Sequence, residues 1–209
     1  YVPVLEDFTL DMDVYAASLE GAKLVCVVHT SNVLGVRNPL EDIIRLGHEA
    51  GSKVLIDAAQ GVPHERIDFD AFGADFMAFS AHKMCGPTGI GALLVRPEVF
   101  EEMEPFMGGG DMIETVTIEG STYQTNEHKF EAGTPRIAEA IGWNAAFGWM
   151  EPLDLKHEHK RLHPANKNTQ SMTKIEYNRM YSILIGVLDK WLMDHNIEKG
   201  RLCLQKILN

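Results

Sequence analysis

Two apolar runs of this sequence end in polar residues: KVLIDAAQ at residues 53–60 and FMAFSAHKMCGPTG at residues 76–89. Both runs open with a short, continuous apolar stretch, which is typical of strands buried in a parallel sheet. Similar runs occur at residues 23–29, KLVCVVH, and at residues 90–95, IGALLV. Strands are therefore predicted at residues 23–29, 53–57, 75–80 and 90–95.

A helix is predicted between the strands at residues 23–29 and 53–57. Residues 39–51 begin with proline, carry Glu41 and Asp42 in the first turn and stop at Gly51, which are start and stop signals of a helix. A strand, a helix and a second strand form a βαβ unit, whose strands run parallel and whose crossover is right-handed. A turn or short helix at residues 69–73 precedes the third strand. Residues 20–100 thus predict an α/β sheet with helices packed on it.

The composition limits the classes of function. The chain has 209 residues, 45% of them hydrophobic and 23% charged, so one folded core with a smaller appendage is expected. A net charge of −11 argues against nucleic acids and anionic membranes as partners and favours small solutes. No run of residues resembles a membrane span or a signal peptide. Because the sequence does not open with methionine, the N-terminus is expected to be missing or processed.

The cysteines indicate the compartment. Cys26, Cys85 and Cys203 are far apart and have no paired spacing, so neither a disulfide framework nor a zinc site is expected. A reducing compartment fits this pattern. The expected location is the cytoplasm, or the plastid or mitochondrion if the source is a eukaryote.

Polar residues gather at the carboxyl ends of the predicted strands, where α/β sheets bind ligands. In chain order they are Asn32, Asp57, Gln60, Ser80, His82 and Lys83. A partly desolvated lysine at such a position can form a Schiff base with a carbonyl compound. An aspartate is the partner that a protonated pyridine nitrogen requires. The pair suggests pyridoxal phosphate. The glycines at residues 108–110 match no P-loop pattern, so a nucleotide-binding P-loop is not expected.

Several longer motifs carry a family resemblance. They are VVHTSNVLG (27–35), the whole segment from VLIDAAQ to ALLVR (54–96), GGGDMI (108–113) and KFEAGTP (129–135). Over about residues 1–150 the sequence resembles class V aminotransferase-fold enzymes, most closely the Suf-type cysteine desulfurase/selenocysteine lyase group. The resemblance implies the large domain of a fold-type-I pyridoxal phosphate enzyme, with a mostly parallel sheet between helices in three layers.

The resemblance also implies roles for single residues. Lys83 would bind the cofactor as a Schiff base, and Asp57 would pair with the pyridine nitrogen. Asn32 and Gln60 would lie near the phenolic oxygen. Ser80 and His82 would contact the phosphate. Gly133 and Thr134 would reach the phosphate of a neighbouring subunit, which implies a homodimer with shared sites.

The activity implied is conversion of L-cysteine to L-alanine, with the sulfur passing through an enzyme persulfide to an acceptor protein for iron–sulfur cluster assembly. The persulfide cysteine of the family is not recognisable here. Cys203 lies between leucines, Cys26 lies in a strand predicted to be buried, and Cys85 follows the lysine turn. The chain is therefore expected to be a desulfurase core without its sulfur-handling cysteine. Two alternatives stay open: another fold-type-I enzyme, such as an aminotransferase or a kynureninase-like lyase, and a non-catalytic dimerising remnant.

The rest of the chain has a different character. Residues 151–174 are polar and histidine-rich and are interpreted as a linker. His157, His159 and His163 fit a solvated linker better than a metal site, so no metal is expected. Residues 175–209 have apolar residues at helical spacing and are predicted to form a helical tail of unknown role.

Overall fold

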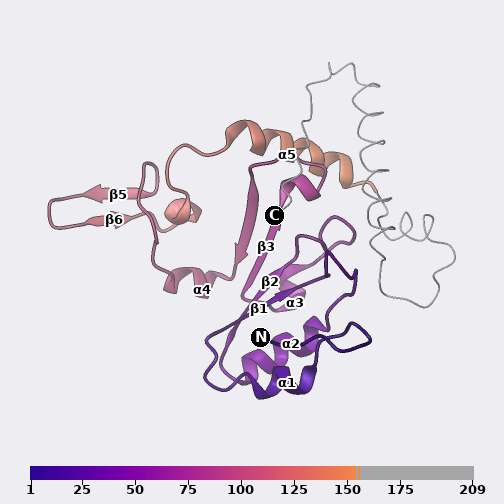
Figure 1. Ribbon diagram of the computed structural model, residues 1–209. Coiled ribbons are helices and arrows are strands. Elements are labelled where there is room, and N and C mark those ends of the chain that lie inside the picture. Colours follow the sequence, from indigo (N-terminus) through magenta and orange to yellow (C-terminus); the bar gives the residue numbers. More distant parts are fainter. Residues whose placement is uncertain (154, 156–209) are drawn as a thin grey trace.

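The structure is a computed structural model and describes residues 1–153 and 155 (Figure 1). Its elements, with η marking 3-10 turns, are α1 (Met12–Ala17), β1 (Leu24–Val28), α2 (Leu40–Glu49), β2 (Lys53–Asp57), α3 (Phe69–Phe72), β3 (Phe76–Ser80), η1 (Ala81–Lys83), β4 (Gly91–Val95), α4 (Pro97–Glu102), β5 (Ile113–Val116), β6 (Ser121–Tyr123), η2 (Glu127–Phe130) and α5 (Ile137–Met150). The strands β1 to β4 and the helix α2 lie within the predicted segments. The predicted linker, the three histidines within it and the predicted helical tail lie outside the described residues.

Four strands form one sheet in the order β1-β2-β3-β4. β1, β2 and β3 pair in parallel, and β4 runs antiparallel to β3. The parallel pairing expected of the βαβ unit is confirmed. β4 runs antiparallel because only residues 81–90 join it to β3, and a parallel pairing of consecutive strands needs a longer crossover connection.

One face of the sheet packs against helices. Val54, Ile56 and Met77 of β2 and β3 are buried against Leu40 and Ile44 of α2. Successive residues of a strand point to opposite faces, so these side chains form one continuous apolar surface. Full burial of a side chain of this size stabilises the fold by roughly 1.5–3 kcal/mol. This cluster therefore holds β2 and β3 in place beneath the candidate site.

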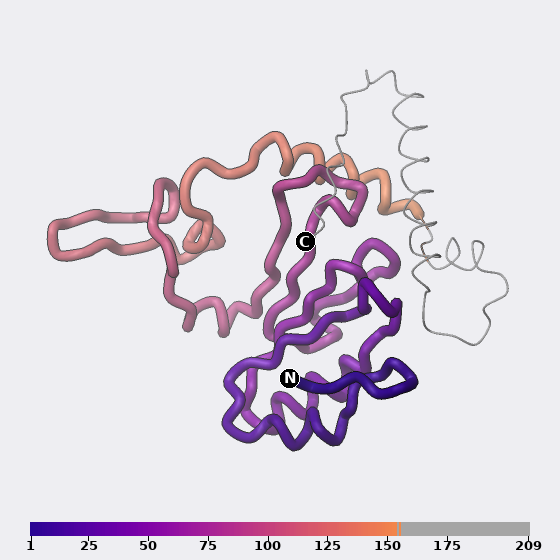
Figure 2. Tube along the Cα trace, viewed as in Figure 1, coloured from indigo at the N-terminus to yellow at the C-terminus, as the bar shows by residue number. Residues whose placement is uncertain are grey.

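Two further helices, α1 and α5, extend this layer. Tyr15 of α1 packs with Ile43 of α2, and its hydroxyl donates a 2.7 Å hydrogen bond to the Ile43 carbonyl. At the other end of the sheet, Trp143 and Ala146 of α5 pack over Met84. Figure 2 shows α5 at the end of the sheet away from the N-terminal segment. The turn that carries Lys83 is thus covered by α5.

The opposite face of the sheet carries no helix among residues 1–153 and 155. Leu24, Cys26 and Val28 of β1 and Leu93 of β4 are exposed there. The prediction that Cys26 lies in a buried strand is therefore wrong for the described part, because β1 packs against helices on one side only. The described residues contain the sheet and the helical layer on one of its faces.

The hairpin of β5 and β6 projects away from the sheet (Figure 1). Its two strands pair antiparallel, and Val116 and Ile118 are exposed in it. Met112 at its base is buried. None of the helices in the described part of the chain combines the length and hydrophobicity that a membrane crossing requires.

Candidate functional site

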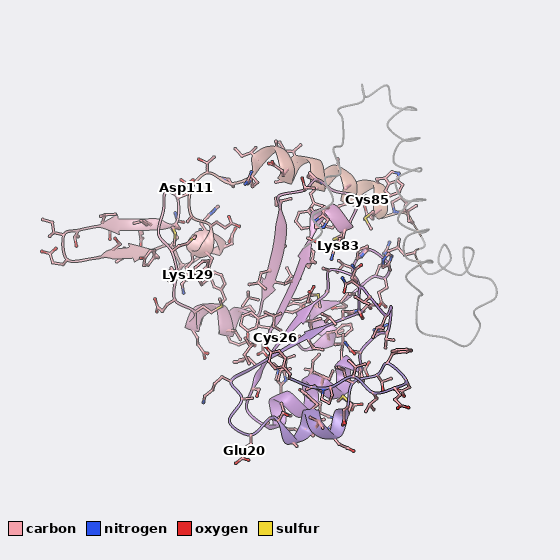
Figure 3. The ribbon with its side chains drawn as sticks, in the orientation of Figure 1. Glu20, Cys26, Lys83, Cys85, Asp111 and Lys129 are labelled. Carbon is pink, nitrogen blue, oxygen red and sulfur yellow. The ribbon has the colours of Figure 1, made fainter. Side chains whose placement is uncertain are left out.

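The carboxyl ends of β2 and β3 meet at one edge of the sheet. Asp57, the last residue of β2, lies between Val28 of β1 and Ala78 of β3 in the strand register. Ser80 ends β3, and the turn η1 follows it directly and contains His82 and Lys83. Figure 3 shows Lys83 beside α5 at this end of the sheet.

The turn that carries Lys83 is held by backbone hydrogen bonds. The Ala81 amide donates to the Ile90 carbonyl at 3.1 Å, and the Ala81 carbonyl accepts from the Met84 amide at 2.8 Å and the Gly86 amide at 2.9 Å. Gly86 has no room for a side chain, because a β-carbon there would lie 2.9 Å from the Trp143 ring. The backbone on both sides of Lys83 is therefore fixed by the sheet and by α5.

Burial sets the charges around this turn. Desolvation, followed by the neighbouring charge of Lys83, lowers the pKa of His82 below its usual 6.5, so the ring is neutral near pH 7. Burial raises the pKa of the Cys85 thiol to about 11. Within the described part of the chain, the Lys83 amine has no ion-pair partner. The turn thus offers one unpaired amine beside a neutral imidazole.

Asp57 and Asn32 are both exposed. The Asp57 carboxylate accepts one hydrogen bond, at 3.0 Å from the Ala59 amide. Asn32 lies in the loop that follows β1. The carboxylate therefore keeps most of its acceptor capacity for a further group.

Gln60 is buried in the turn after β2, at 8% exposure. Its Oε1 atom has no hydrogen-bond partner among the described residues. A buried amide without a partner costs free energy, roughly 1–3 kcal/mol, and calls for a ligand or a further side chain. Because the two ends of an amide exchange by a simple rotation, Gln60 can present a donor or an acceptor to such a group.

Sequence reasoning did not select His29 and Glu65. His29 follows β1 and is fully buried, and its Nε2 atom lies 3.5 Å from Glu65 Oε1. The other Glu65 oxygen pairs with Arg37 at 2.9 Å. A histidine at the end of an apolar run was the available signal, but nothing local indicated its partners.

Gly133 and Thr134 lie apart from the strand ends. The Gly133 amide donates to the Gly110 carbonyl at 2.8 Å, at the base of the β5–β6 hairpin. Figure 3 shows Asp111, next to Gly110, well away from Lys83. Within one chain, the structure therefore gathers six of the eight predicted site residues at one edge of the sheet and the two loops beyond it, and leaves these two elsewhere.

A cavity of about 670 Å³ lies between α5, β3 and the residues that follow β2. Met77, Phe79, Met84 and Phe147 contribute apolar walls, and none of the eight predicted site residues lines it. The described residues contain no group of three or more side chains arranged to hold a metal ion. The strand-end edge is therefore the better candidate for chemistry.

Comparison with known proteins defines the class. The family model for aminotransferase class-V matches residues 1–183. The chain belongs to this family, and the mostly parallel sheet with a lysine turn after β3 agrees with that assignment.

The individual relatives are cysteine desulfurases. The chain is 51% identical over 144 residues to a probable cysteine desulfurase of Streptomyces coelicolor, covering 67% of this chain and 34% of the relative. It is 43% identical over 160 residues to a cysteine desulfurase of Cronobacter sakazakii, covering 76% of this chain and 39% of the relative. The chain thus spans well under half the length of these relatives.

Solved structures agree with this. The cysteine desulfurase CsdA of Escherichia coli is 33% identical, with a TM-score of 0.71 over 79% of this chain and 44% of that one. The cysteine desulfurase of Thermococcus onnurineus is 36% identical, with a TM-score of 0.72 over 78% of this chain and 42% of that one. The expected family and the fold-type-I class are confirmed. Of the three expected layers, the described residues contain the sheet and one helical layer.

Proposed function

We propose that this chain is the pyridoxal-phosphate-binding core of a cysteine desulfurase. The observation that carries the proposal is an unpaired lysine, Lys83, at the end of a strand whose neighbour ends in a carboxylate, Asp57. The similarity to cysteine desulfurases supports the cysteine substrate. A further structural neighbour, described as SspA in complex with cysteine, is 29% identical with a TM-score of 0.53.

The chemistry of the donor set fits this cofactor. The Asp57 carboxylate has free acceptor capacity for a protonated ring nitrogen, and the unpartnered Oε1 end of the Gln60 amide needs a polar partner. Lys83 would hold the cofactor, and Asn32 would join Gln60 near its phenolic oxygen. The phosphate would be bound by Ser80 and His82, and by Gly133 and Thr134 of a second copy of the chain. The proposed assembly is therefore a homodimer.

Each side chain then has a definite task. When bound, the cofactor supplies an electron sink for the bonds broken at the α-carbon of the substrate. Asp57, as a carboxylate, would stabilise positive charge on the pyridine ring of the cofactor. Lys83 Nζ carries protons to and from the substrate as a general acid or base. The neutral His82 donates a hydrogen bond without adding a charge.

Sulfur transfer needs a thiolate outside this machinery. A thiolate attacks the sulfur of the substrate, and the bond between that sulfur and the β-carbon breaks. The β-carbon takes up a proton, which gives alanine, and the attacking thiol becomes a persulfide. Cys85 is unsuited, because burial raises its thiol pKa to about 11 and keeps it protonated near pH 7. Cys26 is exposed, but it lies in the middle of β1, and Figure 3 shows it away from Lys83. We therefore propose that the attacking thiol lies outside the described residues or on a sulfur-acceptor protein, in a pathway such as iron–sulfur cluster assembly. Selenocysteine would be handled by the same groups.

Titration of the full chain with pyridoxal phosphate tests the cofactor proposal. A new absorbance band near the visible edge is expected, and Lys83→Ala should abolish it. Lys23→Ala is the matched control, because Lys23 is an exposed lysine just before β1, at the opposite edge of the sheet. The absence of a band in the unmodified chain would refute the proposal.

Product analysis separates the enzyme classes. Release of alanine and sulfide from cysteine, with an added thiol as acceptor, is expected of a desulfurase. A band without these products would favour another fold-type-I enzyme, such as an aminotransferase or a kynureninase-like lyase. A chain that dimerises but binds no cofactor would be a non-catalytic remnant.

A further inference from the structure

Two loops at the strand ends carry the two amide side chains of the candidate site. Asn32 lies in the loop 30–38 after β1, and Gln60 lies in the segment 58–67 after β2. The proposed function requires both amides to meet one cofactor. Their relative position therefore depends on what joins the two loops.

The loop after β1 is closed on itself at its base. The Asn38 amide donates to the His29 carbonyl at 3.0 Å, and Asn38 Nδ2 donates to the Val28 carbonyl at 2.8 Å. Thr30 and Arg37 form an isolated antiparallel bridge. These bonds give the loop a shape, but they do not connect it to the segment that carries Gln60.

The connection is made by His29, Glu65 and Arg37, which we call the loop clamp. The buried His29 ring lies against Gly61, the residue after Gln60, so closely that a β-carbon on Gly61 would be 2.6 Å from Nδ1. Glu65 Oε2 accepts a 2.9 Å hydrogen bond from Arg37. Glu65 Oε1 lies 3.5 Å from His29 Nε2, a packing contact without a hydrogen bond. The Glu65 carboxylate, which belongs to the segment after β2, thus contacts two residues at the base of the loop after β1.

Each member of the clamp is held separately. His29 Nδ1 is hydrogen-bonded to the Thr30 hydroxyl at 2.9 Å, which orients the ring. The Glu65 amide donates to the Gly61 carbonyl at 3.1 Å, which fixes the backbone of the acid. Burial lowers the pKa of His29, so the ring is neutral near pH 7. The neutral ring packs against Gly61, between the two loops. The Glu65 side chain is 24% exposed, so solvent screens its bond to Arg37 only in part.

We propose that Glu65 is a positioning residue that, through His29 and Arg37, sets the position of Asn32 relative to Gln60. The inference rests on the proposed function for its purpose, since Glu65 is not assigned a contact with cofactor or substrate. A contact that only stabilised the fold would change the free energy of unfolding without changing hydrogen exchange in the loop 30–38 or the affinity for the cofactor. A positioning contact must change both the exchange and the affinity.

The test uses the full chain and four variants. Glu65→Ala removes the link, Glu65→Gln keeps its shape and an acceptor oxygen, Glu65→Ala with Arg37→Ala removes both partners, and Arg45→Gln is the control. Arg45 makes exposed ion pairs with Asp42 and Glu49 within α2, so it reports the general effect of losing a surface pair. Amide hydrogen exchange of residues 30–38 and the dissociation constant of pyridoxal phosphate, read from its absorbance band, are measured for each.

Glu65→Ala is expected to speed exchange in residues 30–38 and to weaken cofactor binding, each by about tenfold, the change that a loss of 1.4 kcal/mol gives. Glu65→Gln should recover most of both effects. Adding Arg37→Ala should change neither further, because it removes a link that is already lost. Arg45→Gln should match the unmodified chain. If Glu65→Ala does not fold, Arg37→Ala alone supplies the comparison, since it removes only a half-exposed side chain.

The outcomes separate the two proposals. If the unmodified chain binds no pyridoxal phosphate, the proposed function fails and the positioning role fails with it, while faster exchange would still show that the clamp joins the loops. Unchanged exchange in Glu65→Ala would overturn the clamp even if the cofactor binds. Faster exchange with an unchanged dissociation constant would overturn the positioning role alone.

Discussion

Replacing Gly91 by alanine would place a methyl group where the backbone of the neighbouring strand already lies. Gly91 opens β4 opposite Ser80, which is the last residue before the lysine turn. A β-carbon at Gly91 would lie 2.7 Å from the Phe79 carbonyl oxygen and 3.5 Å from the Ser80 α-carbon. Both neighbours are backbone atoms, so no side-chain rotation can relieve the overlap. The strand pair must separate or shift.

The expected cost follows from this overlap. Overpacking of a well-packed site costs about 1–3 kcal/mol. Each kcal/mol lowers the melting temperature of a protein of this size by about 2–4 °C, so a fall of about 2–12 °C is expected. Because the shift displaces Ser80, and with it the turn to Lys83, the cofactor band should also weaken at a given pyridoxal phosphate concentration.

Thermal unfolding of the full chain, followed by circular dichroism, measures the effect. Gly148→Ala in α5 is the matched control, because no atom lies within 4 Å of a β-carbon there. This control should be neutral or stabilising by up to about 1 kcal/mol, since alanine favours helices over glycine. Equal melting temperatures for Gly91→Ala and the unmodified chain would refute the reasoning. So would an equal loss in both variants.

Two other changes test the packing and charge around the site. Asp75 is buried and accepts hydrogen bonds from the Val54 amide at 2.7 Å and from His48 at 2.8 Å. Asp75→Ala should therefore lower the free energy of unfolding, measured in urea, by about 1–3 kcal/mol. An unchanged urea midpoint would contradict this role. Burial, opposed by the Glu65 charge, lowers the pKa of His29 below 6.5, so its contribution to stability is complete above pH 6.5 and is lost as the pH falls toward the folded-state value. Urea midpoints at descending pH should therefore decline below pH 6.5, and more steeply than in His29→Asn; parallel declines would assign the effect to other groups.

The pH response at lower values has a different source. Burial acts to raise the pKa of Asp75, but the hydrogen bonds from His48 and Val54 and the charges of His48 and Lys53 outweigh it, so the pKa lies below 3.8. Its contribution is therefore complete above pH 3.8 and is lost only as the pH falls below that value. The decline attributed to His29 and the decline attributed to Asp75 thus occupy separate pH ranges.

The sequence by itself determined the strands β1 to β4, the helix α2 and the end of the sheet at which the candidate site is expected. Short apolar runs predict strands because a strand that is buried in a sheet must carry apolar side chains. The polar residues that follow these runs, Asp57 and Lys83, are local features of the chain. The order of β1, β2 and β3 followed from the handedness and short reach of the βαβ connection. The motifs around these residues were also enough to indicate the family.

Only the tertiary structure decided which strand faces are covered and which distant residues meet. Periodicity could not reveal that Cys26 is exposed, because exposure depends on what packs on each face. The apolar character of α5 on all sides likewise concealed the face that Trp143 buries. Glu65 and Arg37, which are 28 residues apart, meet because two loops leave adjacent strand ends, and such a contact leaves no periodic trace in the sequence.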